Sequence, residues 1–328
     1  MSTLGIPHID SQLEREIASH LESVEQLLAS HIKGEYPLVV ETSRHLVEAG
    51  GKRFRPLITL LASQFGKGVT REVIEAAVVC ELTHVATLYH DDVMDEAPLR
   101  RGVESANNRW GNSVAILTGD YLFSKASDLL ADLGPEAVRL QAKTFERLVI
   151  GQIQETQGPA AGINPLDHYL KVVADKTGSL IATSARFGAM LSGAPQSAVE
   201  TLTVFGEKIG IAFQLADDVI DIASDSSQSG KTPGTDLREG VPTLVTLQIL
   251  TSNNSEDNEL RTKLSKPLSD DDAQEVLRQL RTHPALSRAK EQLHALALEA
   301  KDLLQPLPNN SAKAALENLC VAIVDRTA

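Results

Sequence analysis

The stretch 85–95 reads Val85-Ala86-Thr87-Leu88-Tyr89-His90-Asp91-Asp92-Val93-Met94-Asp95, an apolar run that ends in a five-residue acidic motif. The motif returns as Asp217-Asp218-Val219-Ile220-Asp221, again directly after an apolar run, residues 209–216. Residues four apart lie on one face of an α-helix, so the first and fifth Asp of each copy point the same way. The sequence therefore predicts two helices, each ending in a group of carboxylates.

Carboxylates packed this closely repel one another unless a cation lies between them. A few hard oxygen ligands, with room left for water and phosphate oxygens, are typical of a Mg²⁺ site that holds a phosphorylated substrate. One acidic run near a helix end is more often solvated or capping. Two copies, each behind an apolar run, favour the metal site. The predicted ligands are Asp91, Asp92, Asp95, Asp217, Asp218 and Asp221.

The composition is typical of a globular protein, with 42% hydrophobic and 23% charged residues among 328. That length suits one large domain or two ordinary ones. Aromatic residues make up only 4%, while Ala and Leu are abundant, which favours helices over strands. A net charge of −13 argues against nucleic-acid binding, which needs a basic face. If the protein binds a phosphate group, its Lys and Arg residues must therefore be concentrated at that site.

Helical periodicity dominates the chain, and no stretch shows the period-two alternation of a strand. Apolar residues at three- and four-residue steps over 13–28 predict a first helix, which Ser11 and Glu14 open as a capping box. An amphipathic run over 293–304 predicts a closing helix. The other predicted helices cover 37–49, 72–95, 112–131, 135–157, 167–192 and 196–225, with a shorter one that begins at Pro56. These patterns predict an all-α helical bundle.

Cys80 and Cys320 both lie in apolar, helix-like stretches, so we expect two small buried side chains rather than a disulfide or a metal pair. The first residues lack the basic and apolar regions of a signal peptide. No uninterrupted apolar stretch reaches the roughly 18 residues that a membrane span needs. We expect a cytoplasmic protein.

Four groups of cations follow glycine breaks or stand near the acids. The first is Gly50-Gly51-Lys52-Arg53-Phe54-Arg55-Pro56, whose glycines let the backbone approach an anion. The others are Arg100-Arg101-Gly102, Lys176-Thr177-Gly178 and Lys231. Each alone is more often a solvated charge. Together they favour a ring of cations around an acidic, metal-filled cleft that binds a diphosphate.

In these motifs and in their order, the chain resembles the all-trans polyprenyl diphosphate synthases. The resemblance covers roughly residues 35–250. The motifs that carry it are Gly50-Gly51-Lys52-Arg53-Phe54-Arg55-Pro56, His84, Asp91-Asp92-x-x-Asp95, Arg100-Arg101-Gly102, Gly119-Asp120-Tyr121-Leu122, Lys176-Thr177, Phe213-Gln214-Leu215-Ala216-Asp217-Asp218-x-x-Asp221, Gly230-Lys231 and Gly234-x-Asp236-Leu237.

The resemblance implies an all-α bundle of the isoprenoid synthase type around a deep central cavity, with a single domain over residues 1–328 and a homodimeric assembly. It also implies a reaction that joins isopentenyl diphosphate head to tail to an allylic diphosphate, with Mg²⁺ as cofactor. Asp91, Asp95 and Asp217 would hold the metal, and Asp92, Asp218 and Asp221 would complete or orient its ligand shell. The implied catalytic residues are Asp91, Asp95, Lys176, Asp217 and Asp218.

The resemblance also divides the remaining polar residues between the two substrates. Lys52, Arg55, His84 and Arg101 would bind the diphosphate of isopentenyl diphosphate. Arg100, Lys176, Thr177, Gln214 and Lys231 would contact the allylic diphosphate. The chain departs from the family at Val241, where relatives often carry Lys, which removes one possible phosphate contact.

Ala86 and Thr87 bear on the length of the product. In short-chain relatives of the farnesyl type, a bulky aromatic residue one turn before the first acidic motif blocks the growing tail. Both residues here are small. We therefore predict a product longer than farnesyl, of geranylgeranyl or quinone-side-chain length. The primer and a direct hand-off of a long product to a membrane stay open.

Three other functions are compatible with parts of the pattern. A class I terpene cyclase shares the scaffold and an acidic motif, but it would leave Lys52, Arg55 and Arg101 without a role. A regulatory subunit of a heteromeric prenyl synthase would be expected to lose part of an acidic motif, and both are complete here. A helical scaffold that binds Ca²⁺ would not explain the cations, and EF-hand spacing is absent.

Overall fold

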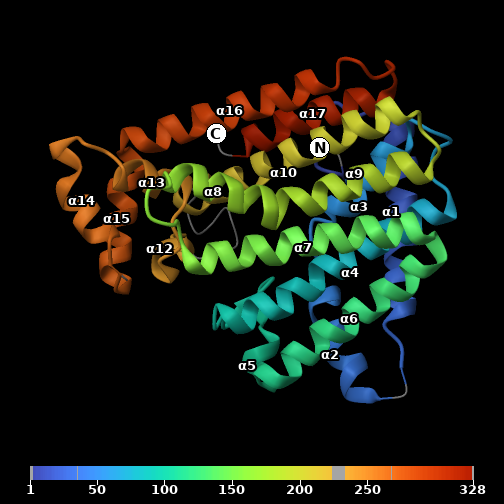
Figure 1. Ribbon diagram of the computed structural model, residues 1–328, viewed down its shortest axis with the longest axis horizontal. Helices are drawn as coiled ribbons and strands as arrows, with labels where there is room; N and C mark the ends of the chain where they lie inside the picture. The colour runs from blue at the N-terminus through green and yellow to red at the C-terminus, as the bar shows by residue number, and fades with distance from the viewer. Residues whose placement is uncertain (1–2, 35, 224–232, 267, 327–328) are drawn as a thin grey trace. The chain divides into compact units, whose positions relative to one another are not determined.

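The structure is a computed structural model that describes residues 3–34, 36–223, 233–266 and 268–326, and helices dominate it (Figure 1). The α-helices are α1 (Ser11–His31), α2 (Pro37–Glu48), α3 (Phe54–Ser63), α4 (Arg71–Met94), α5 (Ala106–Trp110), α6 (Asn112–Leu133), α7 (Pro135–Gln157), α8 (Pro165–Val173), α9 (Ser179–Leu191), α10 (Gln196–Ala223), α12 (Thr235–Glu239), α13 (Leu244–Leu250), α14 (Asn258–Leu264), α15 (Asp270–Thr282), α16 (Pro284–Leu303) and α17 (Ser311–Asp325). The structure also contains a π-helical turn, η1 (Ala174–Gly178), a 3₁₀ turn, η2 (Ser255–Asp257), and two short strands. The all-α prediction is confirmed.

The chain packs into two compact units. Unit 1 comprises residues 1–145, 180–206 and 304–318, and unit 2 comprises residues 146–179, 207–303 and 319–328. The first acidic motif and the cations at 52–55 and 100–101 belong to unit 1. The second acidic motif and Lys176 belong to unit 2. Among the described residues, no helix is both long and apolar enough to cross a membrane.

In unit 1, α4 packs along α6 (Figure 1). The two helices meet closely at Gly119, where a Cβ atom would lie 2.3 Å from His90 Nε2 and 3.1 Å from the Ala86 carbonyl oxygen. A larger residue would push the helices apart, which explains a glycine in the middle of an apolar helix. The α4 helix is apolar around most of its circumference because α1, α3 and α6 all cover it.

Tyr89 connects α4 to α2. Its side chain is fully buried, and its hydroxyl donates to the Thr42 carbonyl oxygen and accepts from the Leu46 N–H at 3.2 Å. Helix phase thus turns Tyr89 away from Thr87. The two hydrogen bonds fix the end of α2 against the helix that carries the first acidic motif.

The helical stretch predicted over 167–192 is confirmed, with a π-turn of one extra residue at 174–178 that joins α8 to α9. Two local predictions are wrong. Asp10, rather than Ser11, caps α1, since its carboxylate accepts the N–H groups of Gln12 and Leu13. The structure also contains a hairpin, β1 (Leu99–Arg100) and β2 (Val103–Glu104), in which each strand is too short to show an alternating pattern.

The two cysteines behave as predicted. Cys80 and Cys320 are buried, and neither forms a disulfide. Burial raises the pKa of the Cys80 thiol to about 12, so this thiol stays protonated at neutral pH. Both side chains therefore act as small apolar residues in the core.

Tyr89→Phe should lower the free energy of unfolding by about 1–3 kcal/mol, because it removes two buried hydrogen bonds between the Tyr89 hydroxyl and the backbone of α2. Urea unfolding followed by circular dichroism measures the change. Tyr121→Phe is the matched control, since the Tyr121 hydroxyl donates to the Lys33 carbonyl oxygen at an exposed site, and we expect a change below about 0.5 kcal/mol. Equal losses in the two variants would contradict the role of Tyr89.

Candidate active site

The first acidic motif forms the end of α4, and its three carboxylates face different surroundings. Asp92 is fully buried, and its Oδ1 accepts a hydrogen bond from Arg100 Nε on β1 at 2.5 Å. Burial raises the pKa of Asp92, while Arg100 counteracts that rise. Asp91 is half-buried and Asp95 is exposed. The outer two carboxylates are therefore accessible, whereas the middle one binds the hairpin.

The second motif repeats this division on α10. Asp218 is buried, its Oδ2 accepts from the Tyr169 hydroxyl, and its Oδ1 accepts from Gln214 Nε2 at 3.0 Å. Burial raises the pKa of Asp218 to about 6, and the two hydrogen bonds oppose that rise. Burial and the nearby Asp218 carboxylate raise the pKa of Tyr169 well above its usual value, so the phenol stays a donor.

Asp217 and Asp221 lie on the more accessible side of α10, and each has protein partners. The Asp217 carboxylate is 2.7 Å from a guanidinium nitrogen of Arg326, which also lies over the Phe213 ring. The two carboxylate oxygens of Asp221 accept the backbone N–H groups of Thr235 and Asp236, each at 3.2 Å, at the start of α12. Asp221 therefore connects α10 to the chain that follows residues 224–232.

The donor set of each motif fits a hard divalent cation that keeps part of its water or phosphate shell. Each motif offers two accessible carboxylates on one helical face, and oxygen ligands of this kind suit Mg²⁺. Within residues 3–34, 36–223, 233–266 and 268–326, no three His, Cys, Asp or Glu side chains converge on a metal position. Two carboxylates for each metal ion agree with the way that Mg²⁺ is bound jointly by protein and phosphate oxygens.

Unit 1 brings three of the four residues predicted to bind isopentenyl diphosphate close to one another. The pKa of His84 is lowered well below its usual value, first by burial and then by the positive charges of Arg55 and Arg101. Arg55 Nε is buried without a hydrogen-bond partner among the described residues. Burial also lowers the pKa of Arg55, and the negative charge of Glu81 opposes that change. Lys52 is exposed in the loop before α3.

Glu81 organises these cations and was missed by the sequence analysis. Its carboxylate is 2% exposed and lies 2.8 Å from Arg53 Nη1 and 3.6 Å from Arg101 Nη2. Both arginines have left-handed backbone conformations, with φ of 45° at Arg53 and 54° at Arg101. Arg101 Nη1 also donates to the Leu46 carbonyl oxygen at 2.6 Å. An acid inside an apolar helix, three residues before His84, was the available signal.

The residues predicted to contact the allylic diphosphate are divided between the units. Arg100 belongs to unit 1, while Lys176, Thr177 and Gln214 lie together in unit 2. Thr177 Oγ1 donates to Gln214 Oε1 at 3.2 Å, and Lys176 Nζ is 2.5 Å from Glu155 Oε2 on α7. Lys231, the fifth predicted contact, lies outside the described residues.

The two chain-length residues sit one turn before Asp91 on α4. Ala86 is fully buried, and its carbonyl faces Gly119 of α6. Thr87 is half-buried, and its hydroxyl donates to the His84 carbonyl oxygen at 2.8 Å. Thr87 is therefore the position of the two where a larger side chain can be accommodated.

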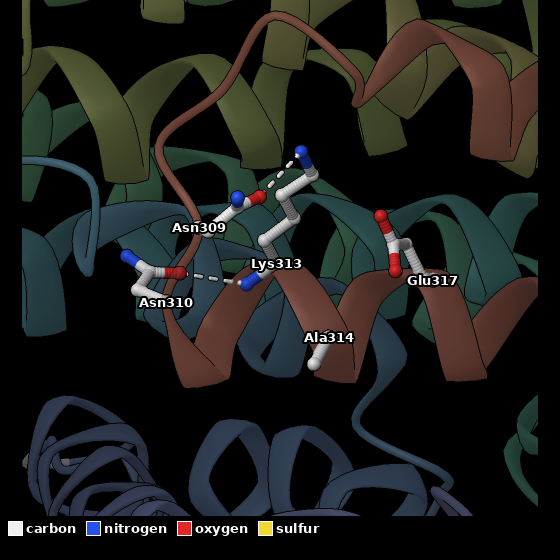
Figure 2. Close-up of a pocket in the computed structure, with 5 residues that line it drawn as sticks. All are labelled: Asn309, Asn310, Lys313, Ala314 and Glu317. Atoms are coloured by element: carbon white, nitrogen blue, oxygen red, sulfur yellow. Dashed lines mark hydrogen bonds between the residues drawn. The ribbon is translucent and has the colours of Figure 1, made fainter.

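Two pockets of the described residues have no predicted site residue in their lining. One, of about 300 Å³, lies at the start of α17, and Figure 2 shows Lys313 beside Asn309 and Asn310. The Lys313 ammonium donates to the carbonyl oxygens of Gln305 and Leu307 and to Asn309 Oδ1, so its charge holds the turn before α17. The other, of about 400 Å³, lies between the end of α7 and the start of α8.

Comparisons with known proteins agree on one family. The family model described as polyprenyl synthetase matches residues 36–280. A nonaprenyl diphosphate synthase of Mycobacterium tuberculosis is 46% identical over 325 residues, which cover 98% of this chain and 96% of that protein. Component 2 of the heptaprenyl diphosphate synthase of Geobacillus stearothermophilus is 35% identical over 314 residues, 94% of this chain and 97% of that protein.

A solved structure leads to the same conclusion. Geranylgeranyl pyrophosphate synthase of Corynebacterium glutamicum, in complex with calcium and isoprenyl diphosphate, superposes with a TM-score of 0.86 and 43% sequence identity. The similarity covers 97% of this chain and 98% of that one. Because the family model matches most of this chain and relatives above 30% identity are covered almost end to end, the chain belongs to the polyprenyl synthetase family of prenyltransferases.

Proposed function

We propose that the protein condenses isopentenyl diphosphate head to tail onto an allylic diphosphate and makes an all-trans polyprenyl diphosphate. The observation that carries the proposal is the repeated arrangement of the acidic motifs. In each, a buried middle carboxylate is held by neighbouring donors and two accessible carboxylates remain. Such pairs suit Mg²⁺ bound jointly with a diphosphate.

Asp91 and Asp95 of one motif, and Asp217 and Asp221 of the other, would each bind Mg²⁺. When bound, Mg²⁺ would stabilise the negative charge that builds on the departing diphosphate. Asp92 and Asp218 would orient the motifs rather than take the metal directly, since both are buried, whereas the other four carboxylates are exposed or half-buried. This division refines the roles that the resemblance implies.

The cations and polar residues would bind and orient the two diphosphates. Lys176, Thr177, Gln214, Arg100 and Lys231 are assigned to the allylic substrate. When its C–O bond breaks, the electron pair leaves with the diphosphate. The double bond of isopentenyl diphosphate then attacks the allylic carbon, and a proton passes to the released diphosphate. Apolar surroundings keep water from the carbocation.

The second diphosphate would bind to Lys52, Arg55, His84 and Arg101. Arg55 supports this assignment, because its buried Nε has no protein acceptor among the described residues and a phosphate oxygen could supply one. The low pKa of His84 leaves its imidazole neutral, so it would act as a hydrogen-bond donor rather than as a positive charge.

We propose a product longer than farnesyl. The relatives named above make nonaprenyl, heptaprenyl or geranylgeranyl diphosphates, so the family allows several lengths. Small side chains at Ala86 and Thr87 support a growing tail that passes this level of α4. The single-domain organisation and the cytoplasmic location stay predictions of the sequence.

We propose that the protein forms a homodimer. Exposed apolar side chains on α6, Ile116 and Leu117, support a protein partner in unit 1. In unit 2, α7 exposes Val149, Ile150 and Ile153 in the same way. The heptaprenyl synthase relative is one component of its enzyme, so a different subunit is the competing occupant of these faces.

A product assay tests the function. Purified protein is incubated with Mg²⁺, labelled isopentenyl diphosphate and, separately, dimethylallyl, geranyl, farnesyl or geranylgeranyl diphosphate. Chromatography then sizes the dephosphorylated products. We expect elongation beyond farnesyl and its loss when a chelator removes the metal, with recovery on addition of Mg²⁺. Diphosphate release from an allylic substrate alone, without incorporation of isopentenyl diphosphate, would indicate a cyclase instead.

Thr87→Phe should shorten the product towards farnesyl, because the ring would fill space before the first acidic motif that the growing tail needs. The same chromatography measures the shift. Thr87→Val is the matched control, since it removes the hydroxyl with little change in size and should leave the product length unaltered. An unchanged product in Thr87→Phe would exclude this position as part of the cavity wall.

Light scattering after size exclusion should give twice the chain mass of 35.3 kDa. Leu117→Glu, which places a charge on a 66% exposed apolar residue of α6, should shift the protein towards the monomer. Val204→Glu changes another exposed apolar residue of unit 1 and should leave the dimer intact. A wild-type monomer would argue against the homodimer.

A further inference from the structure

The π-turn η1 presents two residues of the proposed allylic site, and it lies against a stripe of α7. Arg147, Gly151 and Glu155 are spaced by four residues, so they share one face of that helix. A Cβ atom on Gly151 would lie 2.9 Å from the Lys176 backbone nitrogen and 3.1 Å from Asp175 Cβ. The α7 backbone therefore touches the turn, and only glycine allows this approach.

A second stripe, on α10, contacts the same turn. A Cβ atom on Gly178 would meet the Glu207 carbonyl oxygen at 3.2 Å and the Ile211 side chain at 3.4 Å. One turn further along, Gln214 accepts a hydrogen bond from Thr177. Glu207, Ile211 and Gln214 share one helical face, so η1 is clamped between two faces within unit 2.

Arg147 joins both stripes to the turn. Its Nε donates to Asp175 Oδ1 at 2.9 Å, while Nη1 and Nη2 donate to the two carboxylate oxygens of Glu207 at 3.0 and 3.1 Å. Asp175 directly precedes Lys176 and is only 13% exposed. The fork of a guanidinium fixes two carboxylates in a defined geometry, which a single ammonium cannot do.

We propose that Arg147 is a positioning residue for the allylic diphosphate. It acts through Asp175 and Glu207, which hold η1 so that Lys176 and Thr177 face the substrate. The inference rests on the proposed function of Lys176 and Thr177. Because Arg147 and its two acidic partners all lie in unit 2, the isopentenyl diphosphate residues of unit 1 should be unaffected.

The experiment compares Arg147→Met with Arg147→Lys in the full-length protein. Arg147→Met should raise KM for farnesyl diphosphate about tenfold, because a small displacement of the binding groups is costly. The Kd that calorimetry measures for the non-ionising thiolo analogue of farnesyl diphosphate, in the presence of Mg²⁺, should rise by the same factor as this KM. KM for isopentenyl diphosphate should stay unchanged. Arg147→Lys, which can hold one carboxylate, should show less than about a threefold rise.

Lys208→Met is the matched control. Lys208 follows Glu207 on α10 and pairs with Glu299 at 2.6 Å, so the variant removes an ion pair of unit 2 that does not involve η1. It should alter neither KM value. Thermal unfolding of all variants should stay within about 2 °C of wild type, as expected for partly exposed ion pairs.

Every other outcome contradicts either the positioning role of Arg147 or the proposed function. If the wild type is active and Arg147→Met either changes neither KM value or raises both alike, the positioning role of Arg147 is wrong. The same holds if Lys208→Met reproduces the effect, because any lost ion pair would then suffice. A wild type that transfers no prenyl group to isopentenyl diphosphate overturns the proposed function, and the inference falls with it.

Discussion

The candidate site depends on the removal of one carboxylate from each acidic motif. Three aspartates within five residues of a helix cannot all face the same cation without strong mutual repulsion. Asp92 and Asp218 resolve this by turning inward, where each is buried and held by neutral or positive donors. Their partners come from separate parts of the chain, the hairpin in one unit and α8 in the other. The orientation of each proposed metal-binding pair thus relies on the contacts of the buried carboxylate between its two members.

Local charge matching explains how an acidic protein can present cations to a diphosphate. Arg53 and Arg101 share Glu81, Lys176 pairs with Glu155, and Arg326 pairs with Asp217. Each of these cations has a carboxylate within 4 Å, so it is oriented before a substrate arrives. Arg55 differs from these cations, because its Nε is buried and lacks a protein acceptor among the described residues. A phosphate oxygen could supply that acceptor.

Most helices were predictable from the sequence because apolar periodicity records which face is buried. Of the predicted apolar positions Leu13, Ile17, Leu21, Val24 and Leu28, all but the half-buried Leu21 are in the core. The paired acidic motifs were visible for a related reason, since helix geometry alone places their first and fifth residues together. Arg147, Tyr169 and Glu81 were missed because they act on site residues that are distant along the chain. The hairpin was missed because two-residue strands leave no periodic pattern, although it holds Arg100 in place.

Because of the π-turn, the number of residues between Tyr169 and Thr177 matters more for their contacts with α10 than the side chains of those residues do. Tyr169 and Thr177 are eight residues apart, which in a regular α-helix would place them about 80° apart around the axis. Both nevertheless contact α10, at Asp218 and Gln214, because the turn absorbs one residue and restores a seven-residue spacing. Deletion of one residue before Thr177 would give a regular helix that keeps both contacts, whereas insertion of a further residue would turn one of them about 100° away from α10. Exchange of side chains within 174–178 would leave that register intact.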